Sequence, residues 1–255
     1  MVRGLYTAYT GMMNQQHRLD TITNNLANSA TTGYKKEGAT AQAFDEMFAV
    51  KVRDGSEDYV DKRIGKMSLG VKIGENYTDY SQGNLTQTEN TFDLAIAGDG
   101  FFEISFTNKA DVQSYKYTRD GSFTLTREGF LVTKDGDFVQ GQDGNIQIST
   151  TAEVVIDSQG NIIENGEVTD KLKLVDFVDY NYLKKYGENM YDKVEGYTEK
   201  EPDCQIEQGY LEASNANVIT EMVEMITITR AFETSQKFVQ AADETLEKDV
   251  NLGAL

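Results

Sequence analysis

The sequence contains very little of the residues on which catalytic and metal sites most often depend. Its 255 residues include one Cys, one His, one Pro and no Trp. A zinc site built from Cys and His needs three or four such ligands, so this class of site is excluded. A Ser-His-Asp triad would have to use His17, the single histidine, which we interpret as a surface or subunit-contact residue.

Disulfides and long hydrophobic runs are also missing. Cys204 is the one cysteine, so the chain offers no disulfide framework. No run of about 18 apolar residues occurs, which predicts no transmembrane helix. The N-terminal segment lacks the unbroken apolar stretch of a secretory signal, because Thr7, Thr10 and Asn14 interrupt it. We therefore expect no membrane insertion, and no cleaved signal if the chain is exported.

Basic residues are in deficit, and the deficit is unevenly placed. The chain has 24 Lys and Arg against 42 Asp and Glu, a net charge of -18. Nucleic-acid binding needs clustered Lys and Arg on phosphates, so nucleic acid is excluded as a partner. Residues 1–35 sum to +2 and residues 215–255 to -4, which leaves -16 for residues 36–214. The opposite signs of the two ends favour their pairing with each other.

What the two ends do contain is a heptad repeat of apolar residues, the pattern of amphipathic helices that pack along one face. The N-terminal repeat predicts a helix that ends near Gly33, and the C-terminal repeat predicts a helix over about residues 217–248, roughly 48 Å long. Periodicity leaves open whether these faces pack on each other, on the middle of the chain or on neighbouring subunits. The repeating positions are Leu5, Met12, Leu19 and Leu26, then Val218, Met225, Phe232, Val239 and Leu246.

The middle of the chain has the signature of short β-strands joined by tight turns. Turn dipeptides that end in Gly121, Gly129, Gly136 and Gly144 separate short runs of apolar and β-branched residues. The predicted fold class is mainly β with α-helical termini. A Gly-rich β-domain over residues 71–214 is joined, through a connector at residues 36–70, to a discontinuous helical domain. This helical domain is formed by residues 1–35 with residues 215–255.

The remaining candidates for chemistry are weak. Gly98-Asp99-Gly100 lies between strands and lacks the Lys-Ser/Thr of a phosphate loop, so a tight turn is the better interpretation. Asp135-Gly136-Asp137 lacks the rest of a calcium ladder. A sugar-binding face is an alternative function for the tyrosines of the β-domain, although such tyrosines are more often ordinary surface or interface residues; they are Tyr77, Tyr80, Tyr115 and Tyr117. We predict no catalytic residue, no cofactor and no metal site.

Several separate motifs occur in one order along the chain, at Gly4–Met12, Thr23–Asn28, Thr32–Lys35, Ser81–Leu85, Asp93–Phe102, Tyr117–Phe123, Gln208–Asn215, Glu221–Val223 and Arg230–Glu233. Together they resemble the bacterial flagellar rod and hook family over nearly its whole length. The chain is most similar to the distal rod member, with the proximal rod or a hook-type subunit as the alternative.

The resemblance implies a structural subunit that assembles helically with itself into a hollow rod and transmits torque to the hook. It implies contacts with other rod and hook proteins and with the flagellar export apparatus. It also implies a location in the basal body, outside the cytoplasmic membrane, reached without signal cleavage. The residues expected at subunit contacts are Leu5, Met12, Leu19, Ile22, Asn24, Asn25, Leu26, Val218, Met222, Met225, Phe232, Val239 and Leu246. For the asparagines, local capping of the helix is the simpler alternative.

Overall fold

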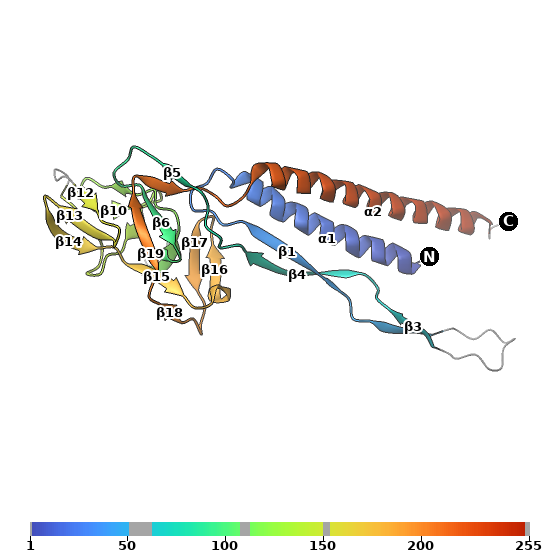
Figure 1. Cartoon of the computed structure of the whole chain (residues 1–255). Helices are drawn as coiled ribbons and strands as arrows, with labels where there is room; N and C mark the ends of the chain where they lie inside the picture. The colour runs from blue at the N-terminus through green and yellow to red at the C-terminus, as the bar shows by residue number, and fades with distance from the viewer. Residues whose placement is uncertain (1, 51–62, 108–112, 150–153, 253–255) are drawn as a thin grey trace. The chain divides into compact units, whose positions relative to one another are not determined.

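The computed structural model describes residues 2–50, 63–107, 113–149 and 154–252. The chain forms two compact units. The helical unit comprises Met1–Leu26, Glu37–Asp79 and Val218–Leu255, and the β unit comprises Ala27–Lys36 and Tyr80–Asn217. The predicted fold class is confirmed: strands dominate the middle of the chain and a helix lies at each end (Figure 1). The finer domain limits at residues 35, 70 and 214 stay a prediction.

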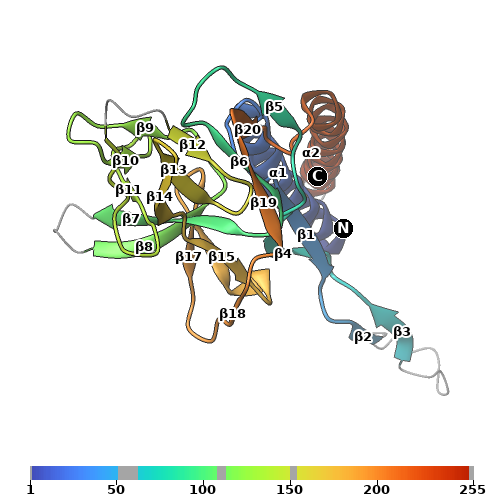
Figure 2. The ribbon, with the colours of Figure 1, turned by 60° about the vertical axis from the view of Figure 1, so that its left-hand side comes forward.

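The helical unit contains the two long helices, α1 (Val2–Ala27) and α2 (Val218–Leu252). They lie side by side and antiparallel (Figures 1 and 2). Arg18 Nη2 donates to Glu224 Oε1 over 2.8 Å, and Asn25 Nδ2 lies 3.4 Å from Glu221 Oε2. The C-terminal end of α1 therefore packs against the first turns of α2. No helix in the described part of the chain is both long and apolar enough to cross a membrane.

The first helix ends earlier than the sequence predicts, at Ala27 rather than just before Gly33. The reason lies in the backbone hydrogen bonds of the following turn. Thr31 N donates to Asn28 O, three residues back, and Gly33 N donates to Glu212 O, from a distant part of the chain. Gly33 does adopt a left-handed conformation, with φ of +66°, but within this turn and not at the helix end.

Two antiparallel strand pairs complete the helical unit. Strand β1 (Glu37–Ala43) pairs with β4 (Val71–Thr78), with a bulge between Ala39 and Ala41. Strand β2 (Met47–Val50) pairs with β3 (Arg63–Met67). The predicted connector is thus an extended two-stranded ribbon where the structure describes it.

The β unit is built from short strands around one large antiparallel sheet. Its path runs β16-β17-β8-β7-β11-β10-β9, and β15 pairs with both β7 and β18. Smaller sheets are β12-β13-β14, β19-β6 and β20-β5. Figure 2 shows β7 and β8 as a long antiparallel pair through this unit. A single 3-10 turn, Tyr180–Tyr182, interrupts the strands of the described part.

The strands of the β unit are, in chain order, β5 (Leu85–Gln87), β6 (Leu94–Gly98), β7 (Phe101–Thr107), β8 (Gln113–Thr118), β9 (Thr124–Leu125), β10 (Leu131–Val132), β11 (Phe138–Val139), β12 (Val154–Ile156), β13 (Asn161–Glu164), β14 (Glu167–Lys171), β15 (Leu174–Phe177), β16 (Leu183–Tyr186), β17 (Met190–Lys193), β18 (Glu199–Lys200), β19 (Cys204–Gln208) and β20 (Tyr210–Glu212). The runs between the glycine turns are therefore strands, as the alternating pattern predicts.

The turn dipeptides behave in two ways. Gly129 N donates to Thr126 O and Gly136 N to Thr133 O, which closes the turns of the β9-β10-β11 meander. Gly121 belongs to no such turn. Its carbonyl accepts from Leu94 N over 3.0 Å, so this dipeptide joins the β9 segment to the start of β6.

Two groups of buried side chains form the core of the β unit. The larger is mostly aliphatic, with two phenylalanines, and includes Leu94, Ile96, Phe102, Phe123, Leu131, Val139, Ile146, Ile162 and Ile206. The smaller is aromatic and comprises Phe101, Tyr117, Phe177 and Tyr191 with Val175 and Leu183. Tyr80 packs on the aromatic group, with its ring centroid 4.9 Å from that of Tyr180.

Candidate functional site

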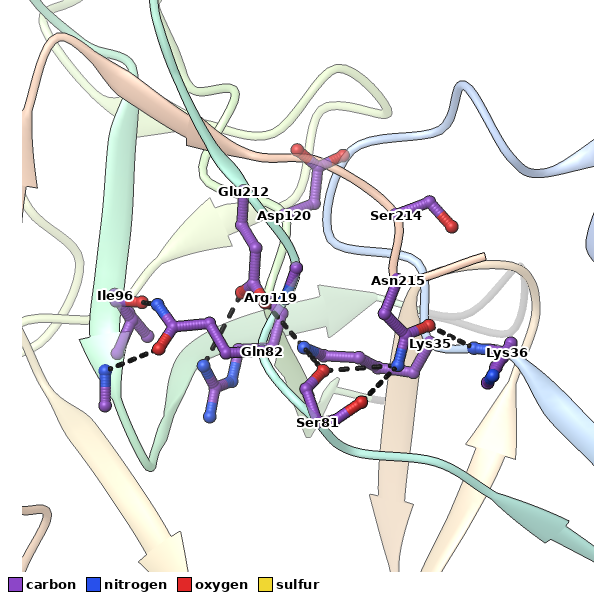
Figure 3. Close-up of polar contacts among 12 residues, drawn as sticks. Lys35, Lys36, Ser81, Gln82, Ile96, Arg119, Asp120, Glu212, Ser214 and Asn215 are labelled. Atoms are coloured by element: carbon purple, nitrogen blue, oxygen red, sulfur yellow. Dashed lines mark hydrogen bonds and ion pairs between the residues drawn. The ribbon is translucent and has the colours of Figure 1, made fainter. Parts of the chain in front are cut away.

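A buried ionic network is the most constrained polar feature of the β unit (Figure 3). The Glu212 carboxylate accepts from Lys35 Nζ over 2.5 Å and from Gly83 N over 2.8 Å. Arg119 Nη1 lies 3.5 Å from its second oxygen. The side chains of Lys35, Arg119 and Glu212 are no more than 2 % exposed. Three distant stretches of chain thus meet at one carboxylate.

The backbone around Glu212 is fixed as tightly as its side chain. Gly33 N donates to Glu212 O over 2.8 Å, and Ala213 N donates to Asn84 O over 2.9 Å. A Cβ on Gly83 would lie 1.9 Å from Ala213 O, and one on Gly33 would lie 2.4 Å from Asp120 N. Such distances leave no room for a side chain. Glycine is required at both positions because the backbone segments approach each other so closely.

Amide side chains extend the network on both sides (Figure 3). Asn215 Oδ1 accepts from Lys36 N, and its Nδ2 donates to Ser81 O over 3.2 Å. Gln82 Nε2 donates to Ile96 O over 2.9 Å, while Gly98 N donates to Gln82 Oε1. These bonds join the segments by which the chain enters and leaves the β unit to its central strands.

The charges of this network make it sensitive to single substitutions. Two buried cations share one buried carboxylate, and Arg119 also lies over the Phe101 ring, 5.2 Å from the centroid. Breaking a buried ion pair by removing one partner leaves an uncompensated charge in a medium of low dielectric. The arrangement therefore holds three segments of the chain together. Among the described residues, no group of three or more His, Cys, Asp or Glu could hold a metal ion.

The heptad positions lie mostly on one side of each helix. On α2, the most buried positions, Glu221 and Ile228, are seven residues apart. They alternate with Met225, Phe232, Val239 and Leu246, which are half-buried. On α1, Ile22 is buried, and Leu5, Met12, Leu19 and Leu26 are half-buried. Glu221 and Ile228 were not among the heptad positions predicted from the sequence, although their spacing of seven marks the second heptad position.

Two of the expected contact residues on α2 are exposed in this chain, Val218 (38 %) and Met222 (48 %). Asn24 is exposed as well, whereas Asn25 is 2 % exposed. The Asn25 side chain donates to Glu37 O over 2.8 Å and accepts from Glu37 N over 2.9 Å. The Asn25 side chain therefore pairs with the backbone N–H and C=O of Glu37, the first residue of β1, as a neighbouring strand would. The role of the thirteen expected residues at subunit contacts stays a prediction.

The other candidate residues named from the sequence make contacts within the fold. His17 Nε2 lies 2.9 Å from Asn76 Oδ1 within the helical unit. Gly98-Asp99-Gly100 forms the turn between β6 and β7, with φ of +117° and +142° at the two glycines. Tyr117 is fully buried, and burial raises its pKa to about 12. A sugar-binding face that depends on Tyr117 is therefore not favoured.

Family models match the chain in three regions. The model for "Flagella basal body rod protein" matches residues 5–35, and that for "Flagellar hook protein FlgE/F/G D1 domain" matches residues 95–164. The model for "Flagellar basal body rod FlgEFG protein C-terminal" matches residues 207–252.

Curated relatives match over nearly the whole length. The flagellar basal-body rod protein FlgG of Bacillus subtilis is 32% identical over 99% of both chains. FlgG of Buchnera aphidicola subsp. Schizaphis graminum is 32% identical over 97% of this chain and 98% of its own. The chain belongs to the flagellar basal-body rod protein family. FlgF and FlgG of Caulobacter vibrioides match at 33% and 30%, so identity does not separate these two members.

In this rod-family chain, the buried network joins all three matched regions. Lys35 closes the first, Arg119 lies in the second and Glu212 lies in the third. Gly83 and Ser81 come from a stretch between the first two. The sequence motifs around these residues were visible, but their meeting at Glu212 was not, because it depends on contacts between residues 177 positions apart.

Proposed function

We propose that this chain is a structural subunit of the flagellar basal-body rod. It would assemble helically with copies of itself into a hollow shaft that transmits torque to the hook. The observation that carries the proposal is the near full-length likeness to flagellar basal-body rod proteins. The helical unit supports it, since exposed apolar side chains on two long helices suit a subunit that has neighbours.

The same proposal includes partners and location. The chain would contact other flagellar rod and hook proteins, pass through the flagellar export apparatus without signal cleavage and reside in the basal body. It would act without turnover, as a mechanical part and not as an enzyme. The charge of -16 over residues 36–214 would then lie on the solvated exterior of the assembly. The thirteen heptad and asparagine positions named from the sequence would contribute to the helical core.

Electron microscopy tests the proposal in two settings. Concentrated purified protein should form hollow tubes of uniform diameter. A strain that lacks the gene should lose rods and motility, and the intact gene should restore both. Leu26→Asp and Phe232→Asp variants should fail to restore them, because each places a charge in the heptad face, while the β unit stays folded. Normal rods in the deletion strain would refute the proposed function.

A further inference from the structure

We propose that neighbouring copies bind through two different surfaces of the helical unit, an apolar ridge on α1 and an apolar groove beside α2. The inference rests on the proposed function, and it specifies which faces meet. The ridge consists of Tyr6, Tyr9 and Met13. The groove is formed by Ile219, Val223 and their neighbours.

The ridge lies on the outer face of α1. Its members are spaced by three and four residues, so they line one side of the helix. They are 48 %, 48 % and 39 % exposed. Ile22 marks the side toward α2, and His17, through Asn76, marks the side toward β4. At 100° per residue the ridge lies almost opposite Ile22 and about 50° from His17, so it borders the side toward β4 and faces away from α2. The Tyr6 ring also lies 6.5 Å from that of Phe44, which orients one end of the ridge.

The helix around the ridge carries no charge. Residues 4–17 contain no Asp, Glu, Lys or Arg. A solvent-facing helix surface normally carries charged side chains on the face opposite its apolar stripe. Cores of protein interfaces, in contrast, are depleted in charge and enriched in Tyr and Met. The composition of this stretch is therefore that of a surface that another protein covers.

The groove lies between the helices where α2 begins. It has a volume of about 520 Å³ and is lined by Gln15, Arg18, Ile219, Thr220, Val223, Glu224, Thr227, Ile228 and Ala231. Ile219 is 75 % exposed and Val223 is 60 % exposed, and Met222 and Ile226 widen the same apolar face. Further along, the outer face of α2 becomes charged, with Arg230, Glu233 and Lys237.

The ridge matches the exposed apolar stretch of α2 in length. Tyr6 and Met13, and likewise Ile219 and Ile226, are seven positions apart, about 10 Å at about 1.5 Å per residue of helix, and the groove itself continues to Ala231. One is a ridge of bulky side chains, and the other is a hollow between helices. This complementary shape favours binding of a ridge to a groove over binding of two ridges or of two grooves.

Charge also favours the mixed contact. The segment that carries the groove, residues 215–255, has a net charge of -4, whereas residues 4–17 around the ridge carry no charged side chain. A contact between two copies of α2 would oppose like charges. A contact between α1 of one copy and α2 of the next avoids this repulsion, which favours the mixed pairing.

One copy cannot fill its own groove. The Arg18–Glu224 and Asn25–Glu221 contacts place Ile219–Ile226 beside the C-terminal half of α1, whereas the ridge lies in its N-terminal half. The centres of the two surfaces are about ten residues apart along the helix axis, roughly 15 Å. Each copy thus carries one ridge and one groove, at different positions along the helix axis. Repeating such a heterologous contact extends a chain of copies and does not close a dimer.

Mixed disulfide formation tests which surfaces meet. Two single-cysteine proteins are made in a Cys204→Ser background, one with Tyr9→Cys and one with Val223→Cys, and one of them carries a mass tag. After equimolar mixing and mild oxidation, we expect the mixed dimer to exceed both like dimers together by about fivefold, since contact raises the effective thiol concentration. Glu233→Cys, on the charged part of the same α2 face, is the matched control and should give only background cross-linking with Tyr9→Cys.

A statistical mixture of dimers, or a yield equal to that of the Glu233→Cys control, would overturn the inference. Electron microscopy of the same proteins under reducing conditions separates this from a failure of the proposed function. Tubes without the mixed cross-link would refute the surface pairing and leave the rod function intact. An absence of tubes even from the unmodified protein would refute the function itself.

A substitution gives an independent readout. Tyr9→Asp should abolish tube formation, because it places a charge in the ridge, and Tyr9→Phe should preserve it. Circular dichroism of dilute protein should be the same for both variants, since Tyr9 is half-exposed in a single chain. Normal tubes from Tyr9→Asp would also overturn the inference.

Discussion

At the scale of single residues, Glu212 has the most consequential position in the β unit. Its side chain and carbonyl together accept from Lys35, Gly83, Arg119 and Gly33. The four donors come from three separate stretches of chain, since Gly33 and Lys35 belong to the same segment. Replacing Glu212 therefore disturbs the entry, the exit and the centre of the unit at once.

The free energy of unfolding of the Glu212→Gln variant should be about 3–5 kcal/mol lower than that of the parent. The substitution leaves the buried cations Lys35 and Arg119 without a negatively charged partner. Urea titration followed by tyrosine fluorescence measures this, as the chain has 14 Tyr and no Trp. Glu207→Gln is the matched control, since Glu207 is exposed in the adjoining strand β19, and it should shift the free energy by less than about 0.5 kcal/mol. Equal midpoints for the two variants would contradict a structural role for the network.

The raised pKa of the Asp137 carboxyl predicts that the stability of the fold depends on pH. Burial, and then the nearby Asp135 charge, raise the pKa of the Asp137 carboxyl above its usual value. The folded state therefore binds this proton more tightly than the unfolded state does. The resulting stabilisation of the fold is complete below the ordinary carboxyl pKa and is lost as the pH rises through the raised pKa of Asp137 in the folded state. Asp137→Asn should be more stable than the parent at neutral pH, and the difference should vanish under strongly acidic conditions.

Urea midpoints at several pH values measure this difference. Asp135→Asn serves as the comparison, since it removes only the secondary cause and should give a smaller gain at neutral pH. A constant offset between Asp137→Asn and the parent across the whole range would rule out the ionisation as its cause.

At the scale of elements, α2 offers two isoleucines two residues apart in opposite surroundings. Ile228 is 3 % exposed, whereas Ile226 is 54 % exposed. Ile228→Ala should cost about 2–5 kcal/mol in the dilute protein through lost burial and a cavity. Ile226→Ala should leave the dilute protein within about 0.5 kcal/mol of the parent. Thermal unfolding followed by circular dichroism compares them, and equal losses would contradict the antiparallel pairing of the helices.

Both helices and some of the strands could be predicted from the sequence. Heptads predicted both helices, and the glycine-bounded runs predicted strands β9, β10 and β11 of the β unit. The end of α1 was not readable, because Gly33 donates to Glu212 O in place of a helix carbonyl. The β1–β4 pair was missed for a similar reason. Its first residue, Glu37, is held by the side chain of Asn25, a contact that no local pattern encodes.

The candidate site was readable only in part. The stripe at Met225 and Phe232 follows from period seven alone, but Glu221 occupies the same face as a buried polar residue that forms a bond to Asn25. The exposed ridge at Tyr9 and the groove at Val223 lie outside that stripe. They could be recognised only after the structure showed which helix faces are already covered.

At the scale of the whole molecule, the uneven charge predicts a salt effect on assembly. Like charges on the acidic middle of the chain repel between copies, while the ridge and the groove are mainly apolar. Raising salt from about 0.1 M to about 1 M shortens the screening length from about 10 Å to about 3 Å. The critical concentration for tube formation should therefore fall.

Sedimentation of tubes from a dilution series measures this concentration. Sucrose at equal osmolality is the control, because it leaves electrostatic screening unchanged. A critical concentration that rises with salt would indicate that ion pairs and not apolar surfaces dominate the contact.

The distance in sequence between Lys35 and Glu212, 177 positions, also sets an order of events in time. A β unit whose first segment is held by its last cannot finish folding while the ribosome is still making the strands between them. Closing such a loop is slow in comparison with local helix formation. The newly made chain therefore passes through an interval in which its β unit is complete in sequence but still open, and the proposed export would use this interval.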